Sequence, residues 1–367
     1  MGGFEDRQPD QDIGRPVMGW MCSATPEELL LAAGLRPMRL YGFEARGAQS
    51  EAIMPTTFCA YVHGVLQAAL DGRFRHLAGV VVVNSCDAMR RLADAWERFV
   101  GTPPVYRLDF PFRCDETAKR HWTNVLNRFA AHLASITGRT ISEADLQAAI
   151  DLMNQTRRTI QALDQLRASK NRPISGTDFA DWAAKACMQD KKRFLLESSS
   201  LLEHAQSKNF THQSGPRIVL GGCAANARTL VWLVEKCGAL IVGDELCTGA
   251  RHFHTLVDES MDPMQAVAHR YLRRTPCARR MDGGDYIGHV LDLVREARAD
   301  GVVFQTLKFC DPIRWRLHRL GNALTRQGIP FLHVERDGSA ASWGPLETRL
   351  EAFMETLQCP SEVSTHA

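Results

Sequence analysis

Short apolar runs rich in β-branched residues alternate with amphipathic helical stretches along most of the 367-residue chain. A continuous apolar run without polar alternation is typical of a strand buried on both faces of a parallel sheet. Strand and helix alternate in both halves of the chain, so the sequence predicts an α/β fold of two doubly wound, Rossmann-like parallel-sheet lobes. The expected strands are 38–41, 79–83, 105–108, 217–221, 239–242, 301–304 and 329–334.

A long helical region separates the two sets of strands. Apolar residues recur there at three- and four-residue steps, and Ser142 and Asp145 are spaced as in a capping box. We therefore predict a helical insertion between the lobes. The N-terminal lobe is expected within residues 1–110, with helices that extend it to about residue 206, and the C-terminal lobe over 207–367. The expected helices of the insertion are 115–136, 142–167, 177–187 and 191–205.

The overall charge argues against several classes of partner. Lysine and arginine number 44 and aspartate and glutamate 42, a formal net charge of +2, which provides no field for nucleic acid or an anionic membrane surface. The apolar run 78–83 is far shorter than the roughly 20 residues of a membrane span. The acidic start of the chain, with Glu5 and Asp6, does not resemble a secretory signal. We expect a cytoplasmic protein that binds neither nucleic acid nor membrane.

Cysteine is the unusual part of the composition. The eleven cysteines are an odd number, and no two are spaced as C-x-x-C, so a disulfide framework and a zinc ribbon are both disfavoured. Four of them follow expected strands closely: Cys86, Cys223, Cys247 and Cys310. Open α/β sheets bind ligands outside the carboxyl ends of their strands, so these four lie on the side of the sheet where function is expected.

Two of the cysteine segments resemble each other. Cys86-Asp87 and Cys310-Asp311 each follow a strand and a short loop and precede a helix, with Asp as the expected N-cap. A cysteine beside a helix N-terminus is favoured as the thiolate, the form that binds iron or attacks an electrophile. Cys59, at the start of the expected helix 58–70, is the third candidate. Position alone leaves simple packing open for all of them, and it leaves Cys223 between packing and a lining role.

Three segments together resemble the 2-hydroxyacyl-CoA dehydratase family, whose D-component also includes benzoyl-CoA reductase subunits. The segments are NSCDAMRRL (84–92), DELCTGAR (244–251) and KFCDP (308–312), and the resemblance extends from Cys59 to the final helix at 346–357. It implies two Rossmann-like lobes that hold one [4Fe-4S] cluster through Cys59, Cys86 and Cys310, with the fourth iron site open. Cys247 belongs to a matching motif, and the resemblance leaves open whether it binds iron or lines the cleft.

The resemblance further implies the iron–sulfur subunit of a (R)-2-hydroxyacyl-CoA dehydratase, a hydro-lyase that removes water from an acyl-CoA substrate by radical chemistry in an oxygen-poor cytoplasm. Its implied partners are a related second subunit in a heterodimer and a separate ATP-dependent iron–sulfur activator that delivers one electron. This chain has no G-x-x-x-x-G-K-[ST] loop, which fits ATP use elsewhere. The alternatives are a benzoyl-CoA-type (aryl-CoA) reductase subunit, a non-catalytic cluster-bearing partner, and a binding protein without metal.

The sequence does not identify the catalytic base. His63, His252 and His254 are possible bases, although a histidine is more often a surface or core residue than a catalyst. Arg251 and the basic stretch 270–280 could meet coenzyme A phosphates, or they could form a solvated basic face.

Overall fold

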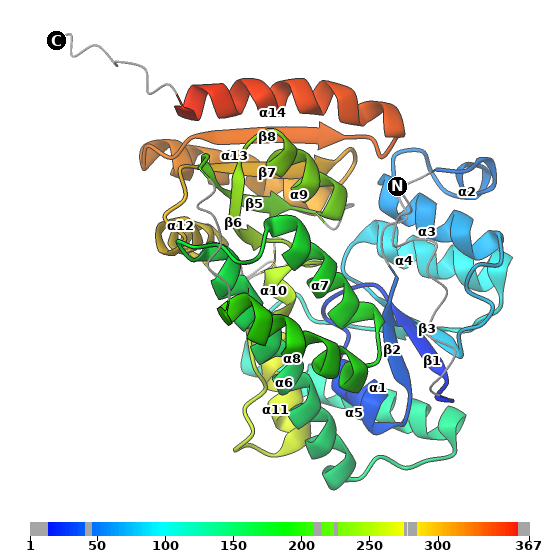
Figure 1. The fold of residues 1–367 in the computed structure, drawn as a ribbon. Helices are drawn as coiled ribbons and strands as arrows, with labels where there is room; N and C mark the ends of the chain where they lie inside the picture. The colour runs from blue at the N-terminus through cyan, green and yellow to red at the C-terminus, as the bar shows by residue number, and fades with distance from the viewer. Residues whose placement is uncertain are drawn as a thin grey trace.

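The computed structural model describes residues 14–40, 46–207, 214–223, 227–274, 277 and 285–358. Two four-stranded sheets, both entirely parallel, lie among flanking helices (Figure 1). The predicted α/β fold of two doubly wound lobes is confirmed. In spatial order the sheets contain β2 (Arg36–Arg39), β1 (Val17–Trp20), β3 (Gly79–Val83) and β4 (Val105–Leu108), and β6 (Leu240–Glu245), β5 (Arg217–Gly222), β7 (Gly301–Leu307) and β8 (Phe331–Arg336).

The two sheets have the same topology. In each, the first strand in sequence pairs with the second on one side and with the third on the other. The chain direction across the sheet therefore reverses between β1 and β3 and again between β5 and β7. A crevice outside the carboxyl ends of the strands at such a reversal is where doubly wound sheets bind ligands.

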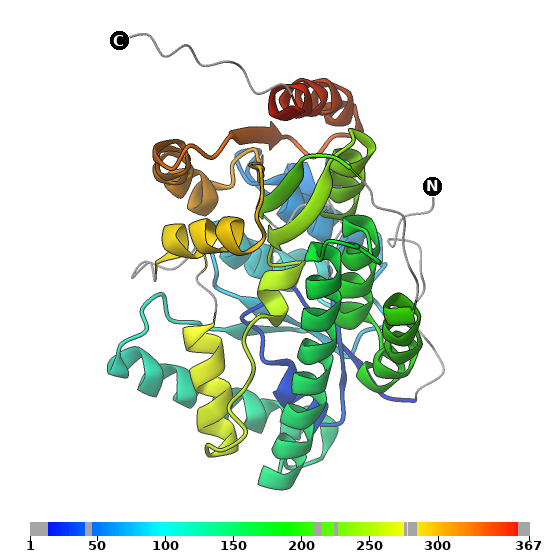
Figure 2. The same cartoon turned by 60° about the vertical axis from the view of Figure 1, so that its left-hand side comes forward.

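Helices cover both sheets (Figures 1 and 2). One further element is a π-helical turn over Trp96–Val100 that continues α4. The helices associated with the first sheet are α1 (Glu27–Ala32), α2 (Ala48–Ile53), α3 (Ala60–Leu70) and α4 (Asp87–Ala95), and those with the second are α9 (Ala227–Lys236), α10 (Ala250–Phe253), α12 (Tyr286–Glu296), α13 (Asp311–Arg326) and α14 (Trp343–Gln358).

The helical region forms a body of its own beside the sheets. The predicted capping box is confirmed at the start of α6, where the Ser142 hydroxyl accepts a hydrogen bond from the Asp145 backbone N–H. Figure 1 shows α6 running beside α8, α10 and α11, and the contacts between these helices agree. The region comprises α5 (Glu116–Thr137), α6 (Glu143–Ala168), α7 (Gly176–Met188), α8 (Lys191–Ser207) and, from the second half of the chain, α11 (Pro263–Arg273).

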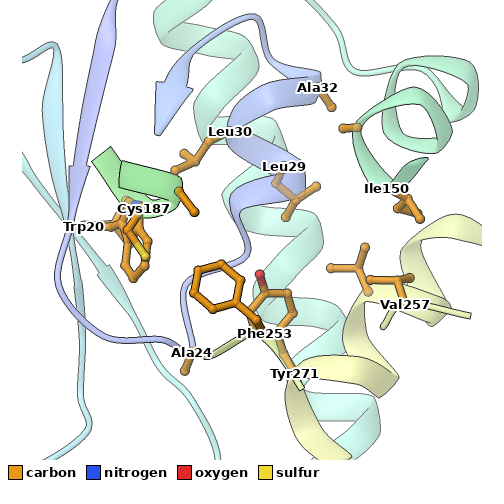
Figure 3. Close-up of a cluster of buried hydrophobic side chains, with 14 of the residues drawn as sticks. Trp20, Ala24, Leu29, Leu30, Ala32, Ile150, Cys187, Phe253, Val257 and Tyr271 are labelled. Atoms are coloured by element: carbon orange, nitrogen blue, oxygen red, sulfur yellow. The ribbon is translucent and has the colours of Figure 1, made fainter. Parts of the chain in front are cut away.

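A large apolar core joins α1 to this helical body. Figure 3 shows Leu29 of α1 facing Ile150 of α6, with Val257 and Tyr271 from the second half close by. All of these side chains are almost completely buried. Because segments from both halves fill one core, the helical body ties the two halves together.

A second core is shared by elements of the two sheets. It contains Val80 and Val82 from β3 together with Val302 and Phe304 from β7, all buried. The same core also contains cysteines from both halves of the chain. In the part of the chain that is described, no helix is long and apolar enough to span a bilayer.

Candidate metal centre

Each of the three cysteines predicted as ligands is the N-cap residue of a helix. Cys59 precedes α3, Cys86 precedes α4 and Cys310 precedes α13, and in none of them does the sulfur accept the capping hydrogen bond. The expectation that Asp87 and Asp311 are the N-caps is wrong, because both are already the first residue of their helix. The partial positive charge of a helix N-terminus therefore lies directly at each cysteine, which favours its thiolate form.

The loop before Cys59 is fixed by hydrogen bonds to its backbone. Arg46 donates to the carbonyl oxygens of Thr56 and Phe58 at 3.1 and 2.7 Å, and His63 Nε2 donates to that of Pro55 at 3.1 Å. Cys59 itself is 9% exposed and belongs to the core that contains residues of both sheets. Its position is thus held from both the preceding loop and the following helix.

Cys86 lies at the carboxyl end of β3. The Asn84 backbone N–H donates to the carbonyl of Leu108 at 3.1 Å, and its side-chain carbonyl accepts from the Phe110 N–H at 2.9 Å. These bonds join the ends of β3 and β4. Cys86 is half-buried and packs against the core that contains Cys59.

Cys310 follows β7 after a tight loop. Its N–H donates to the carbonyl oxygen of Leu307, the last residue of β7, at 3.0 Å. Phe309, just before it, has φ 67°, a left-handed conformation that costs a residue with a side chain about 1–2 kcal/mol. Such local strain concentrates at functional sites. The loop therefore holds Cys310 in a defined position at the carboxyl end of its strand.

Cys223 also lies in this place, although it was not among the predicted ligands. It is 4% exposed and follows β5 directly. Its sulfur is within hydrogen-bonding reach of the Cys310 sulfur, and the pKa of the Cys223 thiol is raised by that contact, by burial and by the nearby Cys59. The sequence placed Cys223 at the functional edge of the sheet, but its neighbours there depend on the strand order, which the sequence does not give.

The structure thus places Cys223 within electrostatic reach of both Cys310 and Cys59, and Cys86 packs against the same core. Within the described ranges, no three histidine, cysteine, aspartate or glutamate side chains converge closely enough to hold a single metal ion. A four-iron cluster is wider than one ion, and its cysteine ligands are correspondingly further apart. The ten cysteines that the structure describes form no disulfide.

Cys247 lies in a different environment, after β6. Its sulfur accepts a hydrogen bond from Arg39 Nη2 at 3.4 Å, and Arg39 also donates to its carbonyl oxygen. Arg39 lies over the ring of Trp20 at 4.9 Å. The guanidinium thus connects the carboxyl end of the first sheet to the loop of Cys247, whose contacts to Arg39 favour a lining and positioning role.

The three histidines that the sequence offered as bases have structural partners. His252 is completely buried and bonds to Glu27 Oε1 at 3.0 Å, and burial lowers its pKa to about 3 despite that carboxylate. Burial also lowers the pKa of His63, whose ring bonds to the backbone of the loop before Cys59. For His254, burial is outweighed by the hydrogen bond and charge of Asp164, which raise its pKa. These contacts give each of the three rings a structural role.

The arginines that the sequence offered for coenzyme A phosphates also have partners within the protein. Arg251 donates to the buried carboxylate of Glu245 at 2.8 Å. Arg270 donates to the backbone carbonyls of Thr255 and His252, and it lies over the Tyr271 ring. Much of the stretch 270–280 lies outside the described residues.

Comparison with known proteins gives consistent similarities over nearly the whole chain. Residues 22–357 match the family model described as 2-hydroxyglutaryl-CoA dehydratase, D-component. The chain is 25% identical to the (R)-phenyllactyl-CoA dehydratase beta subunit of Clostridium sporogenes over 95% of this chain and 93% of that protein. It is 24% identical to the (R)-2-hydroxyglutaryl-CoA dehydratase beta subunit of Acidaminococcus fermentans over 94% and 93%. Against a benzoyl-CoA reductase subunit of Thauera aromatica the identity is 22%, over 95% and 92%.

Proposed function

Because the chain belongs to the 2-hydroxyglutaryl-CoA dehydratase D-component family, we propose that it is the iron–sulfur subunit of a (R)-2-hydroxyacyl-CoA dehydratase. The match of the family model over residues 22–357 carries this proposal. Relatives that are named as beta subunits of phenyllactyl-CoA and 2-hydroxyglutaryl-CoA dehydratases support it, since they align over almost their whole length.

The proposed ligands of a [4Fe-4S] cluster are Cys59, Cys86 and Cys310. Their places at three helix N-termini support the assignment, because each helix favours the thiolate that iron requires. Their common apolar surroundings also support it, since a cluster shielded from water keeps a defined potential. This chain contributes helix N-termini beside the three cysteines and an apolar core around them.

When bound, such a cluster supplies a single electron and a Lewis-acidic iron, so that the thioester can expel its α-hydroxyl and the β-proton becomes acidic. This chain's residues would prepare the site for that chemistry. Cys59 and Cys310 are themselves 9% and 4% exposed and belong to one apolar core, so little water reaches them. Arg39 fixes the loop of Cys247 through its sulfur and its carbonyl oxygen.

We propose two protein partners. A related second subunit is supported by the relatives that are named as beta subunits. A separate activator that hydrolyses ATP and delivers the electron is supported by the lack of a G-x-x-x-x-G-K-[ST] loop in this sequence. The sensitivity of such chemistry to oxygen fits an anaerobic cytoplasm as the place of action.

Iron analysis of protein purified without oxygen tests the proposal. We expect about four iron and four sulfide per chain, and dehydration of a 2-hydroxyacyl-CoA once the partner and the activator are added. Cys86→Ser and Cys310→Ser should each lose the cluster. Cys187→Ser is the control, because Cys187 packs beside Trp20 in the other core (Figure 3). Equal iron in all three variants, or an iron-free wild type, would contradict the assignment.

A second candidate function is that of a benzoyl-CoA-type reductase subunit, favoured by the relative from Thauera aromatica. The same cluster would then deliver electrons to an aromatic ring. Parallel assays of 2-hydroxyacyl-CoA dehydration and of benzoyl-CoA reduction, each with activator present, separate the two functions. A cluster-bearing subunit that does not itself bind substrate is the third candidate.

A further inference from the structure

A pocket of about 300 Å³ lies at the carboxyl ends of β7 and β8, beside the first turn of α14. Figure 1 shows α14 lying along β8. The backbone N–H of Lys308 donates to the carbonyl oxygen of Arg336 at 2.7 Å and so joins the two strand ends. Doubly wound sheets bind ligands outside this edge, and Cys310 follows β7 at the same edge.

The pocket walls combine apolar and cationic side chains. Val334 of β8 and Leu346 of α14 are 1% and 4% exposed, and both line the pocket. Three cationic side chains line it as well: Lys308, Arg336 and Arg349. Small-molecule sites typically pair an apolar wall with a few fixed polar groups. This lining suits an anionic ligand that also has a less polar part.

Arg336 is a buried cation in the pocket wall. It is 2% exposed. Its Nε donates to the Ser342 hydroxyl oxygen at 3.2 Å, and its guanidinium lies over the Trp343 ring, 3.4 Å from the centroid. A guanidinium whose orientation is already fixed loses little freedom when it meets a phosphate or a carboxylate. The positive charge at the pocket is therefore built into the fold.

Lys308 and Arg349 are the exposed cations of the pocket. Arg349 Nη2 donates to the carbonyl oxygen of His333 at 2.7 Å, and Lys308 Nζ lies 5.4 Å from the centroid of the Phe309 ring. Neither contact neutralises a charge. Among the residues that the structure describes, neither side chain has a carboxylate partner. Both side chains therefore keep donors for a ligand.

The two carboxylates that line the pocket have partners of their own. Glu335 forms an ion pair with Arg314 at 3.5 Å, and the Asp337 carboxylate accepts a hydrogen bond from the Ser339 backbone N–H at 2.8 Å. With Arg314 included, four cations face two carboxylates, and the surplus of two positive charges matches the charge of a phosphate monoester. The N-terminus of α14, which borders the pocket, adds to this positive potential.

We propose that this pocket binds a phosphate ester. The phosphate contacts the three cationic side chains, and the attached group packs against Val334 and Leu346. The pocket is at the small end of ligand pockets, so the rest of the ligand extends beyond it. Two kinds of ligand carry this chemistry, the coenzyme A part of an acyl thioester and a free nucleotide. In the first case the inference rests on the proposed function, and this chain itself holds the substrate by its nucleotide end, near Cys310.

Isothermal titration calorimetry of the full chain, purified without oxygen, tests the pocket with coenzyme A, ADP, adenosine and inorganic phosphate. We expect the esters to bind, adenosine not to bind, and the affinity to fall as salt is added. Lys308→Met and Arg349→Ala each remove one cation from the pocket and should weaken binding by about tenfold. Arg326→Ala is the control, since it removes the same charge from the last turn of α13, which leads to the opposite end of β8.

The outcomes separate the two ligands. Tighter binding of coenzyme A than of ADP assigns the pocket to the acyl-CoA substrate, and ADP binding that is at least as tight assigns it to a free nucleotide. The proposal is overturned if neither ester binds more tightly than adenosine, if inorganic phosphate binds and the esters do not, or if both pocket variants bind as wild type does. If Arg349→Ala does not fold, Lys308→Met decides, because its side chain is exposed.

The iron content of the same preparation tests the cluster separately. An iron-free chain that binds the esters, with weaker binding by the two pocket variants, refutes the proposed function and leaves the pocket in place. A chain with about four iron that binds neither ester refutes the pocket alone.

Discussion

Gly222 is a residue at which even a methyl group would disturb the end of β5. We expect Gly222→Ala to lower the free energy of unfolding by at least about 3 kcal/mol, because the added Cβ meets the carbonyl oxygen of Gln305 and φ 132° is unfavourable for alanine. Urea denaturation, followed by circular dichroism, measures the change.

Gly238→Ala is the matched control. Gly238 also has a positive φ, 84°, but no atom lies within 4 Å of its added Cβ. Its cost should be only the conformational one, about 1–2 kcal/mol. Equal losses in the two variants would show that the close approach at Gly222 does not matter.

His252 makes the stability of the protein depend on pH. Its pKa is lowered to about 3 by burial, and Arg39 and Arg270 lower it further, while Glu27 opposes them. In the unfolded chain the imidazole takes up a proton near pH 6.5, but in the folded protein it stays neutral. Stability is therefore lost as the pH falls below about 6.5, by about 2 kcal/mol between pH 7 and pH 5.

Urea denaturation of wild type and His252→Gln at pH 7 and pH 5 measures this contribution. The glutamine keeps a donor for Glu27 and does not titrate, so its loss on acidification should be smaller by about 2 kcal/mol. Glu27 adds little in this range, because Lys191 and His252 outweigh the effect of burial and lower its pKa to about 2. Parallel pH profiles of the two proteins would refute the prediction.

At the scale of the elements, hydrophobic patterns predicted those strands whose own residues favour strand structure. The strands at Gly79–Val83 and Val105–Leu108 have their predicted bounds, since each is a continuous run of strand-forming residues. Strand β1 was not predicted, because Val17–Trp20 contains methionine, glycine and tryptophan in place of a β-branched run. Its two neighbours in the sheet stabilise it, which is a tertiary effect.

Helix starts show the same limit. Asp87 and Asp311 are good capping residues by propensity, yet the N-cap of each helix is the preceding cysteine, which makes no capping bond. The loops that join these helices to β3 and β7 determine where they start. The cysteine motifs therefore suggested candidate ligands, but the sequence did not predict at which residue the neighbouring helices begin.

The capping box of α6 gives a prediction at this scale. Ser142→Ala removes the hydroxyl that accepts from the Asp145 N–H and should destabilise the protein by about 1 kcal/mol. Ser135→Ala, an exposed serine near the end of α5, should change stability by less than about 0.5 kcal/mol. Thermal unfolding of both variants beside wild type measures the difference, and identical melting temperatures would argue against the cap.

At the scale of the molecule, buried charges connect α1 to the helical body. Arg157 of α6 donates to Glu28 Oε1, and the Tyr271 hydroxyl of α11 donates to Glu28 Oε2 at 2.8 Å. Both charged side chains are completely buried, and burial, which would raise the Glu28 pKa, is outweighed by the charges of Arg157 and Arg270, which lower it. Three distant segments thus meet at one carboxylate.

Glu28→Gln should therefore destabilise the protein by about 3–5 kcal/mol, because Arg157 keeps its charge in the core without the compensating carboxylate. Asp292→Asn breaks the exposed pair with Arg295 and should cost less than about 1 kcal/mol. Urea denaturation at neutral pH compares them. Equal small losses would mean that the buried pair contributes little.

The arrangement of the whole molecule also explains why the contact between Cys223 and Cys310 was not predicted. Cys310 comes much later in the chain, and the two meet only because β5 pairs with β7. That pairing follows from the order β6-β5-β7-β8, which alternation of strand and helix does not specify. The sequence patterns predicted which cysteines lie at the carboxyl edge of the sheet. Only the strand order shows which of them are neighbours there.

The backbone of Leu307 hydrogen-bonds to both Cys223 and Cys310, which has a practical consequence for handling the protein in air. Two thiols held this close are prone to oxidative crosslinking. Preparations aged in air would then contain this disulfide until a reductant such as dithiothreitol reopens the bond.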